Sequence, residues 1–315
     1  MHDTDTFLTT LYVMCDDFCK SHLASAPSVP GPKAQLCPAE LLTLSLFSQF
    51  GRFPSEHAFF RFAHKRLRGA FPSLPDRSRF NRALRAHYPL LCAFFHHTVC
   101  EALRDHAPRC FEVMDRTAVV TRNSSRRGSG WLPHHANIGF SNRVGFFEGL
   151  GLLLSVSPRG VITGLALASA SCKDQPLADS FLALRAGVLH DACGVHGEQA
   201  RCPYLLDKGF AGHDLHQKWR ELLGAQVICP RQRASKKHPH RWPKLLRKWH
   251  AGLRQIIETV NDKLLFTFGL DRERPHLFEG LQARVVAKAA LHNFCIWLNH
   301  TLHRPPLAFA DLCPD

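Results

Sequence analysis

The stretch that decides the fold is residues 146–169, with the sequence FFEGLGLLLSVSPRGVITGLALAS. It consists of two apolar runs, 146–157 and 161–169, on either side of a turn that contains Pro158 and Gly160. Apolar runs of this length around a Pro/Gly turn are typical of a β-hairpin. We therefore predict two paired strands in the middle of the chain.

Strand and helix patterns continue on both sides of this hairpin. We expect strands at 110–114, 204–206 and 225–229, and helices at 177–189, 215–223, 244–266 and 281–302. One strand, a hairpin, and then helices alternating with strands indicate an α/β fold, with a mixed sheet covered by flanking helices. That order is the one found in ribonuclease-H-like folds.

The composition limits the classes of protein that the chain can belong to. Its 315 residues are 45% hydrophobic, which excludes a disordered or fibrous protein. A formal net charge of +14 favours a polyanionic partner such as nucleic acid. Twelve cysteines without a secretory signal indicate reduced thiols, and no apolar run is long enough for a membrane span. We therefore expect a cytoplasmic protein with no membrane contact.

The N-terminal third has a helical pattern. Short apolar segments joined by turns with Gly or Pro indicate a small helix-turn-helix-like bundle. Nine Lys and Arg lie from Arg52 to Arg85, where only two acids oppose them. We interpret Arg77, Arg79 and Arg82 as DNA-binding residues, although a solvated helix face would produce the same pattern.

The pattern changes near residue 109. We therefore predict two domains, an N-terminal helical DNA-binding region at 1–108 and a catalytic domain at 109–315 that ends in a helix.

Three carboxylates stand out by position. Asp115 and Asp207 each follow a predicted strand, and Glu258 lies at the edge of the apolar stripe of the long helix. Carboxylates that converge can hold two divalent cations, which activate the nucleophile and stabilise the leaving oxygen in phosphodiester chemistry.

Other interpretations of these acids remain open. Asp at a strand end is often a cap or turn residue, and Glu258 could pair with Arg254 or Lys263. Asp262, one helical turn beyond Glu258, is the first substitute for it. Asp174 has the pattern of a helix N-cap.

Three segments resemble the conserved blocks of DDE transposases of bacterial insertion sequences: 74–82 (LPDRSRFNR), 205–210 (LLDKGF) and 254–260 (RQIIETV). The likeness is greatest to the IS982 group and extends to the wider IS4/IS5-like superfamily. It implies that Asp115, Asp207 and Glu258 are the catalytic triad and bind Mg²⁺ or Mn²⁺ as a pair of ions, with Arg254 near the DNA.

The resemblance also implies a set of partners and a place in the cell. The partners would be double-stranded DNA at transposon ends and targets, and a homodimer or higher oligomer on DNA. The place would be the bacterial cytoplasm, in association with the nucleoid. Arg116-Thr117-Ala118 after Asp115, and Leu206 before Asp207, depart from the family pattern. A catalytically decayed transposase that only binds DNA therefore remains an alternative, as does a ribonuclease-H-like nuclease without strand transfer.

A second basic segment leads into the long helix. Its nine cations, with no acid among them, are Arg231, Arg233, Lys236, Lys237, Arg241, Lys244, Arg247, Lys248 and Arg254. Trp242 and Trp249 lie among them, and aromatic rings can stack on exposed bases. We predict DNA contact here, against the alternative of a solvated loop with two tryptophans in the core.

Other candidate sites are weaker. The spacings that include Cys15, Cys92 and Cys193 contain possible zinc ligands, but none has the paired spacing of a strong zinc site. No phosphate-binding loop of the Walker type is present.

Overall fold

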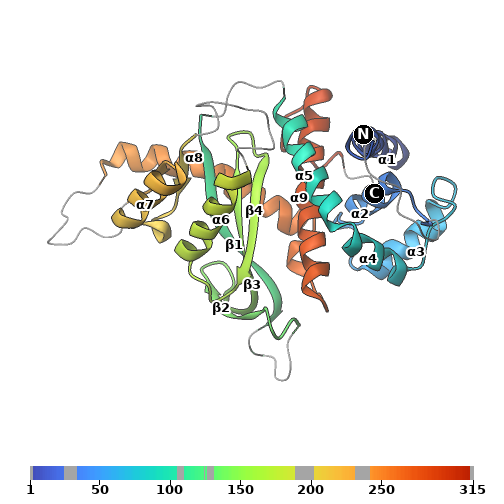
Figure 1. The fold of residues 1–315 in the computed structure, drawn as a ribbon, viewed down its shortest axis with the longest axis horizontal. Coiled ribbons are helices and arrows are strands. Elements are labelled where there is room, and N and C mark those ends of the chain that lie inside the picture. The colour runs from blue at the N-terminus through green and yellow to red at the C-terminus, as the bar shows by residue number, and fades with distance from the viewer. Residues whose placement is uncertain are drawn as a thin grey trace. The chain divides into compact units, whose positions relative to one another are not determined.

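The structure is a computed structural model that describes residues 3–24, 34–104, 110–123, 125, 131–188, 202–230 and 242–312. The chain divides into two compact units (Figure 1). The first unit joins Met1–Ala102 to Lys263–Asp315, and the second is Leu103–Asp262. By its contacts the C-terminal helix therefore belongs with the N-terminal helices, whereas the sequence pattern placed it in a domain with the strands. The functional division near residue 108 stays a prediction.

The first unit is helical in its described residues. Its helices are α1 (Thr4–His22), α2 (Pro38–Phe47), α3 (Glu56–Arg66), α4 (Arg77–Ala86), α5 (Tyr88–Leu103) and α9 (Phe278–Thr301). Asp3, Ser55 and Asp76 begin α1, α3 and α4 by accepting a backbone N–H with the side chain. No helix in the described ranges is long and apolar enough to cross a membrane.

Helix α9 supplies much of the core of this unit. Its side chains are buried over most of its length, as expected for a helix that is apolar on nearly every side. The ring of Phe294 lies 5.4 Å from that of Phe7 in α1, and Phe7 lies 5.3 Å from Phe50. The N-terminal helices therefore complete their core with the last helix of the chain.

The second unit is built on one six-stranded sheet. Its strands are β1 (Glu112–Asn123), β2 (Asn137–Ser141), β3 (Gly145–Val156), β4 (Ile162–Ser169), β5 (Tyr204–Leu206) and β6 (Val227–Ile228). Strand β3 is antiparallel to β1, β2 and β4, whereas β1, β5 and β6 run parallel to one another. Strands β2 and β4 follow each other along the same edge of β3. The sequence predicts a mixed sheet and a hairpin at 146–169, and the structure confirms both.

One expectation about the strands was wrong, and one strand was not predicted. Strand β1 does not end at Asp115 but continues to Asn123, because the polar side chains that look like a loop in the sequence find partners inside the sheet. The Nε atom of Arg122, for example, lies 3.1 Å from a carboxylate oxygen of Glu148 on β3. Strand β2 was not foreseen, because five residues with two apolar positions carry little pattern.

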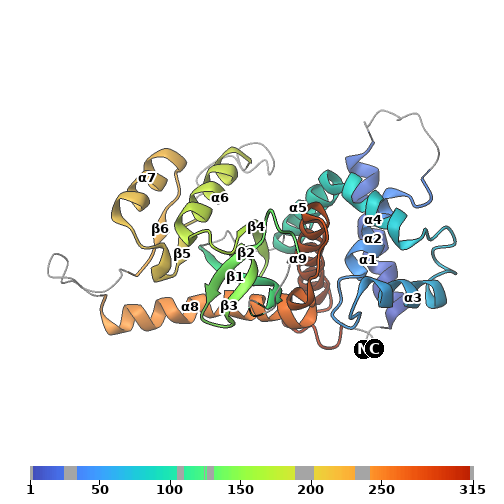
Figure 2. The same cartoon turned by 90° about the horizontal axis from the view of Figure 1, so that it is seen from below.

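Helices cover both faces of the sheet. They are α6 (Asp174–Val188), α7 (His213–Leu223) and α8 (Lys244–Asp262). Figure 2 shows α6 and α7 on one side of the strands and α8 on the other. Side chains alternate along β1 accordingly. Glu112 bonds Arg185 of α6 at 2.6 Å, whereas Asp115, three residues later, bonds Arg254 of α8 at 3.1 Å.

Candidate active site

Two of the three predicted carboxylates lie side by side. Met114 of β1 pairs in register with Leu206 of β5, so the next residues along the two parallel strands are Asp115 and Asp207. Asp207 follows the last residue of β5 and precedes a 3₁₀ turn, Lys208–Phe210. Asp115 lies within β1, which continues to Asn123. It is next to Asp207 because the neighbouring strand β5 ends at this level.

Arg254 of α8 bridges these two carboxylates. Its Nη2 atom lies 3.1 Å from Asp115 Oδ2 and its Nη1 atom lies 3.4 Å from Asp207 Oδ1. Ile257 and Val260 are buried and fix the face that α8 turns to the protein interior. A guanidinium is planar and permanently charged, which suits it to hold two carboxylates at once. The protein thus places a cation of its own between the two acids.

The carboxyl group of Asp115 is destabilised in its charged form. Burial raises its pKa to about 6, and Asp207 and Asp174 add to this rise through their negative charges. The charge of Arg254 and the backbone N–H of Arg116 act in the opposite direction but do not cancel the effect of burial. A carboxylate that is costly to ionise without further positive charge is a common feature of catalytic sites.

The raised pKa predicts that Asp115→Asn stabilises the protein when no divalent metal is present. Between about pH 4 and pH 6 the folded state binds the extra proton, so the stability of the wild type falls as the pH rises through this window. Above it, the charged form costs the folded state about 1–3 kcal/mol, a penalty that asparagine does not have. Chemical denaturation in EDTA at pH 7.5 should show this gain, and the gain should shrink at pH 5. A less stable Asn variant at pH 7.5 would contradict the interpretation.

His250 lies on α8 one helical turn before Arg254, close to the same site. It is buried, and its Nε2 atom has no hydrogen-bond partner among the described residues. Burial lowers its pKa despite a hydrogen bond to the backbone of Ile228, so the ring is neutral near pH 7. On the other side, the thiol of Cys229 lies 3.0 Å from the backbone oxygen of Asp207. The Asp207 turn is thus contacted by the residue that follows β6, and it lies beside α8.

The sequence did not reveal a second cation–carboxylate pair near the acids. Arg116 donates to Asp174 at 3.0 Å and to the backbone oxygen of Ala170 at 2.6 Å. Its side chain lies over Gly151, where a Cβ atom would come within 2.0 Å of the Arg116 Nε atom. A Cβ atom on Gly209 would similarly come within 2.9 Å of an Asp174 oxygen. The two glycines therefore make room for this pair, and Asp174 packs against the turn that follows Asp207.

Glu258 lies one helical turn beyond Arg254 and is exposed. Asp262, its first substitute, is also exposed, and its carboxylate lies 3.5 Å from Arg143. Within the ranges that the structure describes, no three His, Cys, Asp or Glu side chains lie close enough to hold a metal ion. Arg254 thus joins Asp115 and Asp207. Among the described residues, Glu258 makes no hydrogen bond or ion pair with them. Its role as the third acid stays a prediction.

Apart from Arg254, which lies between the two aspartates, the predicted DNA-binding cations fall into three groups. In α4, Arg77 lies 3.6 Å from Glu56, Arg79 lies 3.2 Å from Asp76, and Arg82 is exposed. In the first half of α8, Lys244, Arg247 and Lys248 are all exposed. The remaining cations lie outside the described residues: Arg231, Arg233, Lys236, Lys237 and Arg241.

Of the weak zinc candidates, Cys193 and its partner His196 also lie outside the described residues. His96 and Cys100 of α5 approach to 3.7 Å, and neither they nor Cys15 belong to a metal-binding group in the described ranges.

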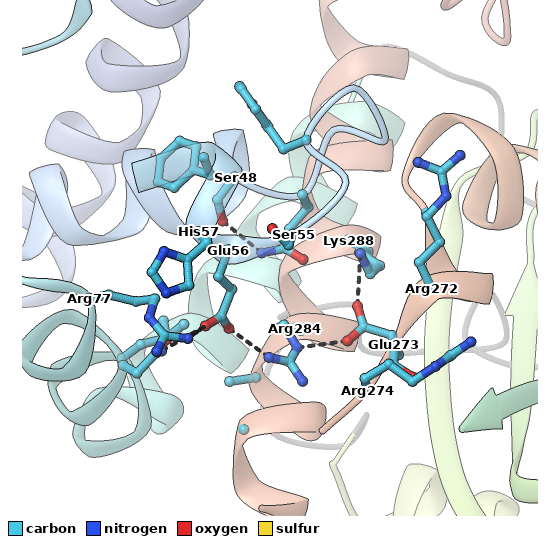
Figure 3. Close-up of a pocket in the computed structure, with 18 of the residues that line it drawn as sticks. Ser48, Ser55, Glu56, His57, Arg77, Arg272, Glu273, Arg274, Arg284 and Lys288 are labelled. Carbon is cyan, nitrogen blue, oxygen red and sulfur yellow. Dashed lines mark hydrogen bonds and ion pairs between the residues drawn. The ribbon is translucent and has the colours of Figure 1, made fainter. Parts of the chain in front are cut away.

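The first unit contains a cavity of about 430 Å³, and a ladder of alternating charges lies along its wall (Figure 3). Arg284 lies 2.6 Å from Glu56 and 2.8 Å from Glu273, and Glu273 lies 3.0 Å from Lys288. Glu273 and Lys288 are almost fully buried. The ladder joins α3, α9 and the segment before α9, so its first role is to hold the two chain segments of this unit together.

Comparison with known proteins places the chain. No curated protein and no solved structure matches it. One family model does, the one described as the transposase DDE domain, and it matches residues 107–294. These residues include the two paired aspartates, Arg254 and Glu258. Because the match covers more than half of the 315 residues, the chain belongs to the transposase DDE domain family.

Proposed function

We propose that this transposase is an IS982-like enzyme that cleaves DNA at the ends of an insertion sequence and joins those ends to target DNA. The family implies an enzyme that cleaves nucleic acid. The observation that carries the more specific proposal is the pairing of Asp115 and Asp207 across two parallel strands, with Arg254 held between them. In this proposal Asp115, Asp207 and Glu258 form the catalytic triad.

The order of the strands supports a ribonuclease-H-like core. Leaving β2 aside, the sheet runs β4-β3-β1-β5-β6, with an antiparallel meander of three strands followed by two parallel additions. The first carboxylate lies on the central strand β1 and the second at the carboxyl end of its parallel neighbour. Ligands commonly bind at the carboxyl ends of parallel strands, where such side chains meet. We assign the helices before β1 to a helix-turn-helix-like DNA-binding region.

The residues present fit a site for Mg²⁺ or Mn²⁺, and transposases of this family generally use a divalent metal. Two carboxylates already converge on one positive charge, that of Arg254, and oxygen is the ligand that these ions prefer. Asp115, Asp207 and Glu258 would hold the ions, of which we expect two. The ions would supply a lowered pKa for the attacking water and charge stabilisation at phosphorus.

The protein's own residues have separate roles in this proposal. Asp115 contributes a partly buried carboxylate whose position is fixed by the sheet, and Asp207 a more exposed one that faces the DNA. Arg254 neutralises both while the site is empty of DNA and offers its guanidinium to the scissile phosphate. The exposed cations of α4 and of the first half of α8 bind the backbone of double-stranded DNA. Joining two ends requires two sites, so we expect a homodimer or a higher oligomer on DNA.

A cleavage assay tests this proposal against its two alternatives. The substrate is a labelled duplex that carries the terminal inverted repeats flanking the gene, incubated with the protein and Mg²⁺ in the presence of a target plasmid. We expect hydrolysed ends first and joined products later. Hydrolysed ends without joined products would instead favour a ribonuclease-H-like nuclease. Binding without any cleavage in Mg²⁺ or Mn²⁺ would favour a decayed transposase.

A further inference from the structure

The tip of the β2–β3 hairpin carries aromatic rings in solvent. Phe140 is 59% exposed and Phe146 is 69% exposed, and Ile138 beside them is 59% exposed. Phe140 pairs with Phe146 across the two strands, and their ring centroids lie 5.2 Å apart at an angle of 64°. Exposed apolar side chains that adjoin one another usually mark a contact surface, whereas single ones do not. We call these three side chains the hairpin patch.

The hairpin is held at both ends. At its base, Asn137 exchanges two hydrogen bonds with Ser171, at 2.6 and 2.8 Å. At its tip, Arg143 lies 3.5 Å from Asp262 at the end of α8. The rings are therefore presented by a supported hairpin, and binding a ligand would cost little ordering of the backbone.

The hairpin patch faces the same side of the sheet as the carboxylates. Phe146 and Leu154 are separated by an even number of residues along β3, so they share a face, and Leu154 lies opposite Asp115 of β1. Helix α8 spans the interval, since Arg254 holds the aspartates and Asp262 meets the hairpin. Eight residues of helix measure about 12 Å. That length corresponds to about three to four nucleotides of a stacked strand.

The chemistry of the hairpin patch favours a base over a protein surface. Among the described residues, two cations beside it are paired with acids, Arg143 with Asp262 and Arg122 with Glu148. A neutral flat ligand therefore suits this part of the surface better than a phosphate. Three side chains of this kind offer roughly 300–400 Å². A stable dimer needs about 800 Å² on each partner. One or two nucleobases, in contrast, would be covered well by two rings.

We propose that Phe140 and Phe146 form a stacking platform for an unpaired base of the DNA strand that is bound at the carboxylates. The proposal rests on the proposed function for the presence of DNA at that face. It adds a preference that the carboxylates themselves cannot supply, namely for a DNA end whose strands are separated a few nucleotides from the cleaved bond.

The test compares a blunt duplex with the same duplex carrying a four-nucleotide unpaired arm that contains 2-aminopurine. Fluorescence anisotropy in EDTA measures affinity without cleavage, and 2-aminopurine emission reports stacking. We expect the wild type to bind the forked DNA at least about fivefold more tightly and to quench the emission. Phe140→Leu/Phe146→Leu, which keeps apolar bulk but removes the rings, should abolish both effects and leave affinity for the blunt duplex and the melting temperature unchanged. Leu184→Ala, at an exposed apolar position on α6, is the matched control and should behave as the wild type.

Three results would overturn the proposal. The first is equal affinity of the wild type for the two DNAs, and the second is a fork preference that survives in the leucine variant. The third is that the leucine variant no longer forms dimers, as measured by sedimentation, but keeps the fork preference. That result would assign the hairpin patch to contact with a second copy of the chain. Fork binding without cleavage of cognate ends would contradict the proposed reaction but leave the platform standing.

Discussion

Asp207→Asn should lower the rate of DNA-end cleavage by at least about a thousandfold, or about 4 kcal/mol of activation free energy, while DNA affinity changes little. The amide keeps the shape of the side chain but removes the negative charge that a divalent ion requires. The fold should tolerate the change, because Asp207 makes no side-chain cap to the turn that follows it and its ion pair with Arg254 is partly exposed. Single-turnover cleavage of labelled ends in Mg²⁺ measures the effect.

The matched control for this substitution is Asp214→Asn. Asp214 lies seven residues further along, in the first turn of α7, and its side chain is fully exposed. The control changes the net charge by the same amount but lies outside the catalytic site. We therefore expect it to retain normal cleavage. Metal-dependent cleavage by the Asp207→Asn protein at the wild-type rate would refute the assignment of Asp207 to the catalytic triad.

The second large effect concerns stability. Glu273→Gln should lower the free energy of unfolding by about 3–5 kcal/mol, because it leaves the ammonium of Lys288 buried beside the guanidinium of Arg284 without its counter-charge. Burial alone would raise the pKa of Glu273, but the charges of Lys288 and Arg284 outweigh burial and hold the pKa below its usual value. Urea denaturation followed by circular dichroism measures the loss.

A double substitution separates the ion pair from other effects at the same position. Glu273→Gln/Lys288→Met removes both buried charges, and we expect it to recover much of the lost stability. Equal stability of the single and double variants would show that the unpaired lysine is not the cause.

The sequence pattern predicted local elements well but could not reveal which of them meet. The strand before Asp207 and the helix that bears Arg254 are visible as apolar runs with clear ends. That Asp115 becomes the neighbour of Asp207 depends on pairing between β1 and β5, which are separated along the chain by three strands and a helix. The bridge from Arg254 to both acids depends on that pairing too. Spacing along a chain carries no information about register between distant strands.

Other misses have equally local causes. The ion pair between Asp174 and Arg116 is not visible in the sequence. An acid at the start of a helix is explained by capping, and a polar residue in a strand by exposure to solvent, so neither residue points to the other. Gly151 and Gly209 were the available signal, since a glycine within or just after a strand often marks a close approach of another group. Nothing in the sequence marks the rings of β2 and β3 as exposed, because aromatic residues in strands are usually interior.

The division of the chain has a consequence for how the protein is made. The first unit contains both ends of the chain, and α9, on which its core depends, is synthesised after the whole second unit. During translation the apolar faces of the N-terminal helices therefore stay uncovered until α9 is made. The strands and α8 emerge in the meantime and can fold. Once folded, the second unit brings the two separated segments closer than a random coil would, and this reduces the entropy lost when they join. A substitution that unfolds the sheet should thus also delay completion of the helical unit, even where the substituted residue touches nothing in it.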